Sequence, residues 1–154
     1  MQPLPHHYDA TASGETSSVI RLRSEATETL TSDAPPAFGG SGEHWSPETL
    51  LCAAVADCFI LTFRAVARAA KLPWTGITCQ VAGTLDRMEG RMAFTHFESH
   101  VRLAVPFGTD LEVARGALQR AKTGCLVANS LRADQVLHLE IETGPQPVTD
   151  PNGA

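Results

Sequence analysis

Two cysteines of this sequence stand in settings that differ sharply. Cys58 lies deep in an apolar run, and Cys125 directly follows Gly124, a glycine placed to end a helix. Two thiols that each hold a defined place on a helix suit dithiol redox chemistry, in which a pair of sulfurs is oxidised to a disulfide and reduced again. The rest of the sequence offers no competing catalytic constellation.

Both thiols also have a purely structural interpretation. Free cysteine is commonly a small core residue, and apolar surroundings would raise the pKa of Cys58 and leave it inert. Cys125 precedes residues 126–131, which we expect to form one helical turn, and a helix N-terminus favours a thiolate. The same position also fits a connector that merely buries a cysteine. Cys52 and Cys79 lack any such context, and we expect both to be structural.

Length and composition indicate one globular domain. The chain has 154 residues, 43% of them hydrophobic, and a mean hydropathy of -0.07. A chain of this length can bury a sizeable core. We therefore expect a single domain over residues 1–154, with the Pro- and Gly-containing ends, about 1–7 and 145–154, frayed.

Charge and hydropathy exclude several function classes. The net charge of -5 and the absence of a Lys/Arg cluster exclude a nucleic-acid-binding protein. The apolar stretch 50–70 is interrupted by Asp57, Arg64 and Arg68, which predicts a buried core helix and no membrane span. The first residues do not resemble a signal peptide, so we expect a cytoplasmic protein.

Metal sites are also not expected. The sequence has no CxxC, and therefore neither a zinc ribbon nor a thioredoxin-type motif. His96 and His100 would share one face of a strand, where they make a poor metal pair without a third ligand.

The first helix has a clear beginning and end. Ser46 is a good N-cap, Pro47 suits the first helical position, and Glu48 complements the positive end of the helix dipole. We expect this helix to run to about Lys71, where Leu72-Pro73 stops it. A capping box at residues 109–112 opens a second helix, which Gly124 closes.

Alternating apolar residues predict the strands. They place a weak hairpin and a third short strand before the first helix, two half-buried strands joined near Glu89-Gly90 between the helices, and a last strand after them: 8–13, 17–23, 26–30, 77–85, 97–105 and 137–141. Residues 33–42 are too rich in Pro and Gly for regular structure and form a long loop. Adjacent strands without crossover helices predict an α+β fold, with the helices on one face of a mostly antiparallel sheet.

Glu48 is a candidate partner for Cys58, but only across two chains. Ten residues of helix span roughly 15 Å, so Glu48 cannot touch the Cys58 of its own helix. It could touch the Cys58 of a second chain if two such helices packed antiparallel. The helix is also more apolar than one small sheet can cover, which favours an obligate homodimer. Stabilisation of the helix start alone would equally explain this carboxylate.

Four segments together resemble the OsmC/Ohr family of thiol-dependent hydroperoxide reductases. They are a Gly-rich loop, a Pro-Glu helix start, an Ala-Cys-Phe segment and a second cysteine motif: residues 39–42 (GGSG), 46–51 (SPETLL), 53–59 (AAVADCF) and 124–131 (GCLVANSL). The resemblance covers essentially the whole chain. It implies an OsmC-like α+β fold with two main helices, assembled as an intertwined homodimer.

The resemblance also implies an activity and the residues for it. Cys58 would be the peroxidatic thiol of a peroxiredoxin-like organic hydroperoxide reductase, acting in the oxidative stress response, and Cys125 the resolving thiol. Glu48 matches the family's acidic residue, which orients an arginine that stabilises the thiolate. No prosthetic cofactor is implied, only an external dithiol reductant, lipoyl-type in the better-known members.

This chain departs from the family pattern at the arginine and in the second cysteine motif, among other positions. The family's arginine lies near the first hairpin turn, where this chain has residues 14–16 (GET); Arg21 and Arg23 are the nearest arginines. Leu126 follows the second cysteine where proline is usual. These departures leave an alternative, a non-catalytic dimer that binds a small apolar ligand at its interface.

Overall fold

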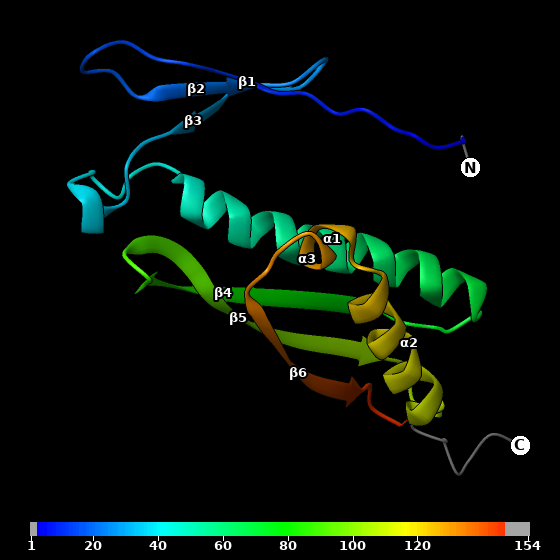
Figure 1. Cartoon of the computed structure of the whole chain (residues 1–154). Helices are drawn as coiled ribbons and strands as arrows, with labels where there is room; N and C mark the ends of the chain where they lie inside the picture. Colours follow the sequence, from blue (N-terminus) through cyan, green and yellow to red (C-terminus); the bar gives the residue numbers. More distant parts are fainter. Residues whose placement is uncertain (1–2, 147–154) are drawn as a thin grey trace, which may run out of the picture. The chain divides into compact units, whose positions relative to one another are not determined.

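The computed structural model describes residues 3–146 of the chain (Figure 1). The outermost parts of the predicted frayed ends, residues 1–2 and 147–154, therefore lie outside the described residues. Helices and strands follow the order strands, helix, hairpin, helices and strand: β1 (Thr11–Ser13), β2 (Ile20–Arg23), β3 (Leu30–Ser32), η1 (Pro36–Phe38), α1 (Pro47–Ala69), β4 (Gly76–Met88), β5 (Arg91–Val105), α2 (Leu111–Gly124), α3 (Leu126–Asn129) and β6 (Asp134–Thr143).

Two compact units make up the chain, Met1–Leu51 and Cys52–Ala154. Each contains one three-stranded sheet, in the order β1-β2-β3 in the first unit and β4-β5-β6 in the second. The α+β class and the mostly antiparallel pairing are confirmed, since three of the four strand pairs are antiparallel. The strands are nevertheless divided between two sheets, where the sequence predicted one.

The first unit is a small antiparallel meander followed by a loop. The predicted hairpin is present as β1 and β2, whereas the third strand, β3, begins four residues later than residues 26–30 would have it. Residues 33–42 hold one 3₁₀ turn, η1, so the prediction that no regular structure forms there was wrong for three residues. Pro35 and Pro36 start this turn because proline fixes the backbone angle that a helical start requires.

Helix α1 begins and ends as its sequence predicts. The Thr49 amide donates to Ser46 Oγ at 3.2 Å, and the Ser46 amide donates to Thr49 Oγ1 at 2.9 Å, which is a reciprocal cap. At the other end Lys71 adopts a left-handed backbone (φ 51°), and the Leu72 amide donates to the Ala67 carbonyl. This Schellman arrangement satisfies the last carbonyls and turns the chain towards β4.

The sheet of the second unit is a long hairpin with a parallel third strand. Glu89 and Gly90 both have positive φ in the two-residue β4–β5 turn, as predicted for this position and as the right-handed twist of a hairpin favours. β6 pairs with β5 in parallel, which was not predicted. The connection between them carries α2 and α3, so a crossover does exist in this fold.

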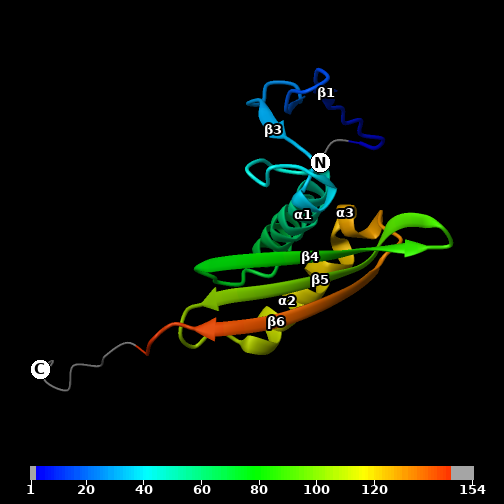
Figure 2. The same cartoon turned by 90° about the vertical axis from the view of Figure 1, so that its left-hand side faces the viewer.

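The three helices lie against one face of this sheet, and the core fills the space between (Figure 2). Alanines of α2 and aromatic residues of α1 meet the inward side chains of β5, of which Leu103 is fully buried. α2 opens with Asp110, whose Oδ1 accepts from the Glu112 and Val113 amides. The predicted capping segment is thus correct, with Asp110 in place of Thr109 as the cap.

Candidate active site

The structure brings Cys58 and Cys125 together inside the second unit. Cys58 lies in the middle of α1, and Cys125 lies at the junction of α2 and α3. Their thiols are close enough that Cys58 contributes to the raised pKa of Cys125. The pair that the sequence singled out is therefore a spatial pair in one protomer.

Gly124 permits this approach because it has no side chain. A Cβ atom at this position would lie 3.1 Å from Thr62 Cγ2 of α1, closer than carbon atoms normally pack. Gly124 is the last residue of α2, as the sequence predicted, but its φ is not positive, so glycine is needed there for close approach and not for a left-handed backbone. Cys125, the next residue, is thereby delivered to the side of α1.

The two thiols differ in their access to solvent. Cys125 is 1% exposed, and its Sγ faces the Val55 carbonyl oxygen at 3.9 Å. Cys58 is half-buried. A solute that reaches this pair in the protomer meets Cys58 first.

Burial keeps the Cys125 thiol protonated. Removal of the thiol from solvent, with a further contribution from the neighbouring Cys58 thiol, raises the pKa of Cys125 to about 11. The Ala128 and Val127 amides at the start of α3 act in the opposite direction, although the side chain makes no complete capping hydrogen bond. The sequence predicted that this helix N-terminus would favour the thiolate; its effect is present, but burial outweighs it.

Of the two further cysteines, Cys79 lies near the pair and Cys52 lies six residues before Cys58 on α1. Cys79 points from β4 into the core, and burial together with the nearby Cys125 raises its pKa to about 11. Burial also raises the pKa of Cys52, against a hydrogen bond from the Gly83 backbone. We still interpret both as packing residues. The sequence did not predict that Cys79 lies close to Cys125. The alternation of β4 placed Cys79 on the core face, and nothing in the sequence showed which helix residue lay above it.

Glu48 lies in the first unit, in the first turn of α1. Its Oε2 is buried and has no hydrogen-bond partner among residues 3–146. It lines a cavity of about 410 Å³ whose other walls are mostly apolar: Ala12, Ile20, Leu22, Ser32, Asp33, Ala34, Pro35, Phe38, Pro47 and Leu50. A buried carboxylate oxygen without a hydrogen-bond partner costs free energy unless a donor from outside the described protomer reaches it.

Neither nearby arginine lines this cavity. Ile20 and Leu22 of β2 do, and because side chains alternate along a strand, Arg21 and Arg23 point to the opposite face. Arg21 lines a separate hollow beside Gly14 and Glu15, and Arg23 donates to Thr29 Oγ1 at 3.0 Å. Within the described part of one protomer, the cavity that holds Glu48 has no arginine in its walls.

Comparison with known proteins places the chain in a family. Residues 40–140 match the family model described as OsmC-like protein. The chain belongs to the OsmC-like family. It is also 31% identical, over 98 residues, to the peroxiredoxin OsmC of Escherichia coli, an overlap of 64% of this chain and 68% of that protein. The resemblance drawn from the cysteine motifs is thereby confirmed.

Solved structures show that the fold is shared as well. An OsmC-like protein of unknown function from Vibrio cholerae has a TM-score of 0.79 at 16% identity, over 88% of this chain and 99% of that one. An organic hydroperoxide resistance protein from Elizabethkingia anophelis has a TM-score of 0.72 at 22% identity, over 94% and 100%. At such identities the likeness establishes the OsmC-like fold for this chain.

Proposed function

We propose that this OsmC-like protein is a thiol peroxidase that reduces organic hydroperoxides to alcohols through Cys58 and Cys125. The observation that carries the proposal is that a half-buried thiol and a fully buried one lie close enough in one protomer for Cys58 to raise the pKa of Cys125. The names of its relatives point in the same direction: peroxiredoxin OsmC and organic hydroperoxide resistance protein.

The proposed reaction begins at Cys58. Its thiolate attacks the terminal oxygen of the hydroperoxide, the O–O bond breaks, and the alkoxide takes up a proton and leaves as the alcohol. Cys58 is left as a sulfenic acid. The oxidation is a two-electron step that needs no metal or organic cofactor.

Cys125 completes the first half of the cycle. Its sulfur attacks the sulfenic sulfur of Cys58, a disulfide forms, and water leaves with the thiol proton. The raised pKa of Cys125 keeps this residue a thiol, and so a poor competitor for peroxide, until Cys58 has been oxidised. An external dithiol, of lipoyl type, then restores both thiols by exchange.

We further propose that the working form is a homodimer. Helix α1 is long and apolar enough to cross a membrane by composition alone, yet only 22% of its most apolar 18-residue stretch is buried in the protomer. Asp57, Arg64 and Arg68 on its exposed side would be costly in lipid. A second copy covers this surface better, and Glu48 of the partner subunit would then be available to the Cys58 site.

Binding without catalysis is the second candidate. The apolar cavity beside Glu48 has the volume of a small-ligand site, and no arginine lines it in the described protomer. A small apolar ligand with one polar group would suit such a cavity. We keep a cytoplasmic location for either function as a prediction.

The test is disulfide mapping after one equivalent of peroxide. Reduced protein is treated with stoichiometric cumene hydroperoxide, quenched by alkylation and mapped by mass spectrometry. We expect a rapid Cys58–Cys125 disulfide with release of cumyl alcohol, which Cys58→Ser abolishes. Cys52→Ser, on the same helix, is the matched control and should leave the reaction intact. Persistence of both free thiols would reject the peroxidase and leave ligand binding as the function to pursue.

A further inference from the structure

A second cluster of chemically capable side chains lies on the other face of the β4–β6 sheet. Glu98 and His100 are two residues apart on β5 and therefore share a face. His138 on β6 is directly opposite His100 in the parallel register. Their neighbours Phe97 and Val101 are buried, which places the three side chains on the solvent side, away from the thiols.

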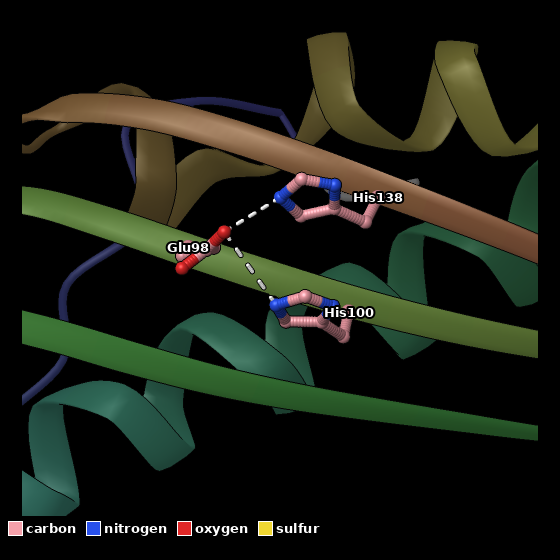
Figure 3. Close-up of side chains that lie close together, drawn as sticks. All are labelled: Glu98, His100 and His138. Atoms are coloured by element: carbon pink, nitrogen blue, oxygen red, sulfur yellow. Dashed lines mark hydrogen bonds and ion pairs between the residues drawn. The ribbon is translucent and has the colours of Figure 1, made fainter.

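The three side chains converge. Glu98 Oε1 lies 2.7 Å from His138 Nε2 and 3.7 Å from His100 Nε2 (Figure 3). One ligand atom from each residue can be chosen so that all lie within 4.8 Å of one another. The imidazole rings are stacked, with centroids 4.4 Å apart and planes 13° apart, so both Nε2 atoms face the same carboxylate.

We propose that Glu98, His100 and His138 bind a divalent transition-metal ion of the zinc type. Two imidazoles and one carboxylate are a ligand set that zinc accepts, with the remaining positions open to water. Zinc holds such ligands at about 2.0–2.1 Å, hence roughly 3.4 Å from each other. Small rotations of three partly exposed side chains would bring the present arrangement to that spacing.

The surroundings favour a cation. Arg102, the nearest positive charge along β5, is held by Glu140 at 3.1 Å and by Glu142 at 3.0 Å. Its charge is therefore matched by two carboxylates, and Glu98 adds a third that no arginine or lysine of the described residues neutralises by an ion pair.

The exposure of the three side chains, 42–54%, leaves room for water ligands. A hollow of about 340 Å³ lies beside the two imidazoles and is lined also by Thr78, Gln80, Arg102 and Glu140, but not by Glu98. It is therefore a neighbouring space and not the position between the three ligand atoms. Magnesium and calcium prefer all-oxygen ligands, so we expect the two histidines to select against them.

A hydrogen bond between Glu98 and His138 explains one of these contacts without a metal. It does not require His100 to stack on His138 and to turn the same nitrogen towards the same oxygen. Spacing along one strand pairs His96 with His100, and the sequence carries no local sign of His138 as the partner or of Glu98 as the third ligand. The expectation that no metal site exists is the one that this proposal revises.

Zinc binding to the full-length reduced protein tests the proposal. Isothermal titration should give one zinc ion per chain, with no competition from magnesium. His100→Ala and His138→Ala should each weaken zinc binding by roughly 10- to 100-fold or more, because loss of a residue that only hydrogen-bonds to a metal ligand already costs that much. Glu98→Gln should also weaken zinc binding. His96→Ala, on the same face of β5 but outside the cluster, should leave the affinity unchanged.

Because thiols also bind zinc, two further measurements distinguish binding at the histidines from binding at the cysteines. Cobalt substitution should give a spectrum without sulfur-to-metal charge transfer, and Cys58→Ser should bind zinc as tightly as the unchanged chain. Thermal unfolding without metal checks that each histidine variant folds. We expect both to fold because the His100 and His138 side chains are about half exposed. Zinc uptake that survives both histidine substitutions, or that is lost in Cys58→Ser, would overturn the proposal.

Discussion

Neighbouring residues of one strand in the β4–β6 sheet face different surroundings, the protein core on one side of the sheet and water on the other. Cys79 and Gln80, or Val101 and His100, are consecutive in sequence and point to opposite sides. On the inner face burial decides behaviour, and thiols there hold their protons to high pH. On the outer face imidazole and carboxylate groups are partly exposed to solvent and therefore accessible to a ligand. The chemistry of each group therefore depends on its face more than on its residue type.

The largest expected contrast is in stability. Phe63 is fully buried and packs edge-to-face on Trp74, with ring centroids 5.6 Å apart. Phe63→Ala should lower the free energy of unfolding by about 3–5 kcal/mol, because it removes apolar contacts and leaves a cavity. Gln80→Ala, on the exposed face of the same sheet, should stay within about 0.5 kcal/mol. Denaturant unfolding of both variants measures this difference, and equal losses would contradict it.

Alkaline pH should act on the inner face. Burial raises the pKa of both Cys79 and Cys125 from 9.0 to about 11. Since the folded chain holds these protons more tightly, their contribution to stability is complete below pH 9 and is lost as pH rises from 9 towards 11. The free energy of unfolding is measured against pH in this window for the unchanged chain and for the double variant Cys79→Ala, Cys125→Ala. We expect it to fall more steeply with pH in the unchanged chain. A slope that is the same in both would show that these thiols are not responsible.

The smallest effect concerns single methyl groups on α2. Gly124→Ala directs its methyl at Thr62, whose Oγ1 donates to the Cys58 carbonyl at 2.7 Å and cannot turn away freely. We expect a loss of about 1 kcal/mol from overpacking and slower disulfide formation. Gly116→Ala meets only the flexible end of Arg120 at 3.5 Å and should instead stabilise the helix by about 0.5–1 kcal/mol. Thermal melts of the two variants should thus shift in opposite directions; shifts of the same sign would contradict the close-approach role of Gly124.

Local signals in the sequence were sufficient for most individual elements. The Ser46-Pro47 start of α1, the Glu89-Gly90 turn and the short helix after Cys125 all depend on residues within a few positions of one another. Such short-range preferences act wherever the segment lies in the fold. They also located Cys58 and Cys125, because each cysteine stands at a recognisable place on its own helix.

Long-range relations were beyond the same reasoning. The parallel pairing of β5 with β6 depends on how the connection between them packs, and no local pattern encodes it. The stacking of His100 with His138 follows from that pairing and was missed with it. The interaction of Cys79 with Cys125 was missed for the same reason, since it joins a strand to a helix end that is distant in sequence.

The connection from β5 to β6 has a consequence for how homologous chains can vary in length. It presents Cys125 to Cys58 and also fixes the register in which His138 meets His100. A slip of β6 by one residue would carry His138 to the core side and Leu139 to the water. We therefore expect insertions and deletions to be rare in this crossover and common in the β4–β5 turn, because the crossover positions both the thiol pair and the imidazole pair.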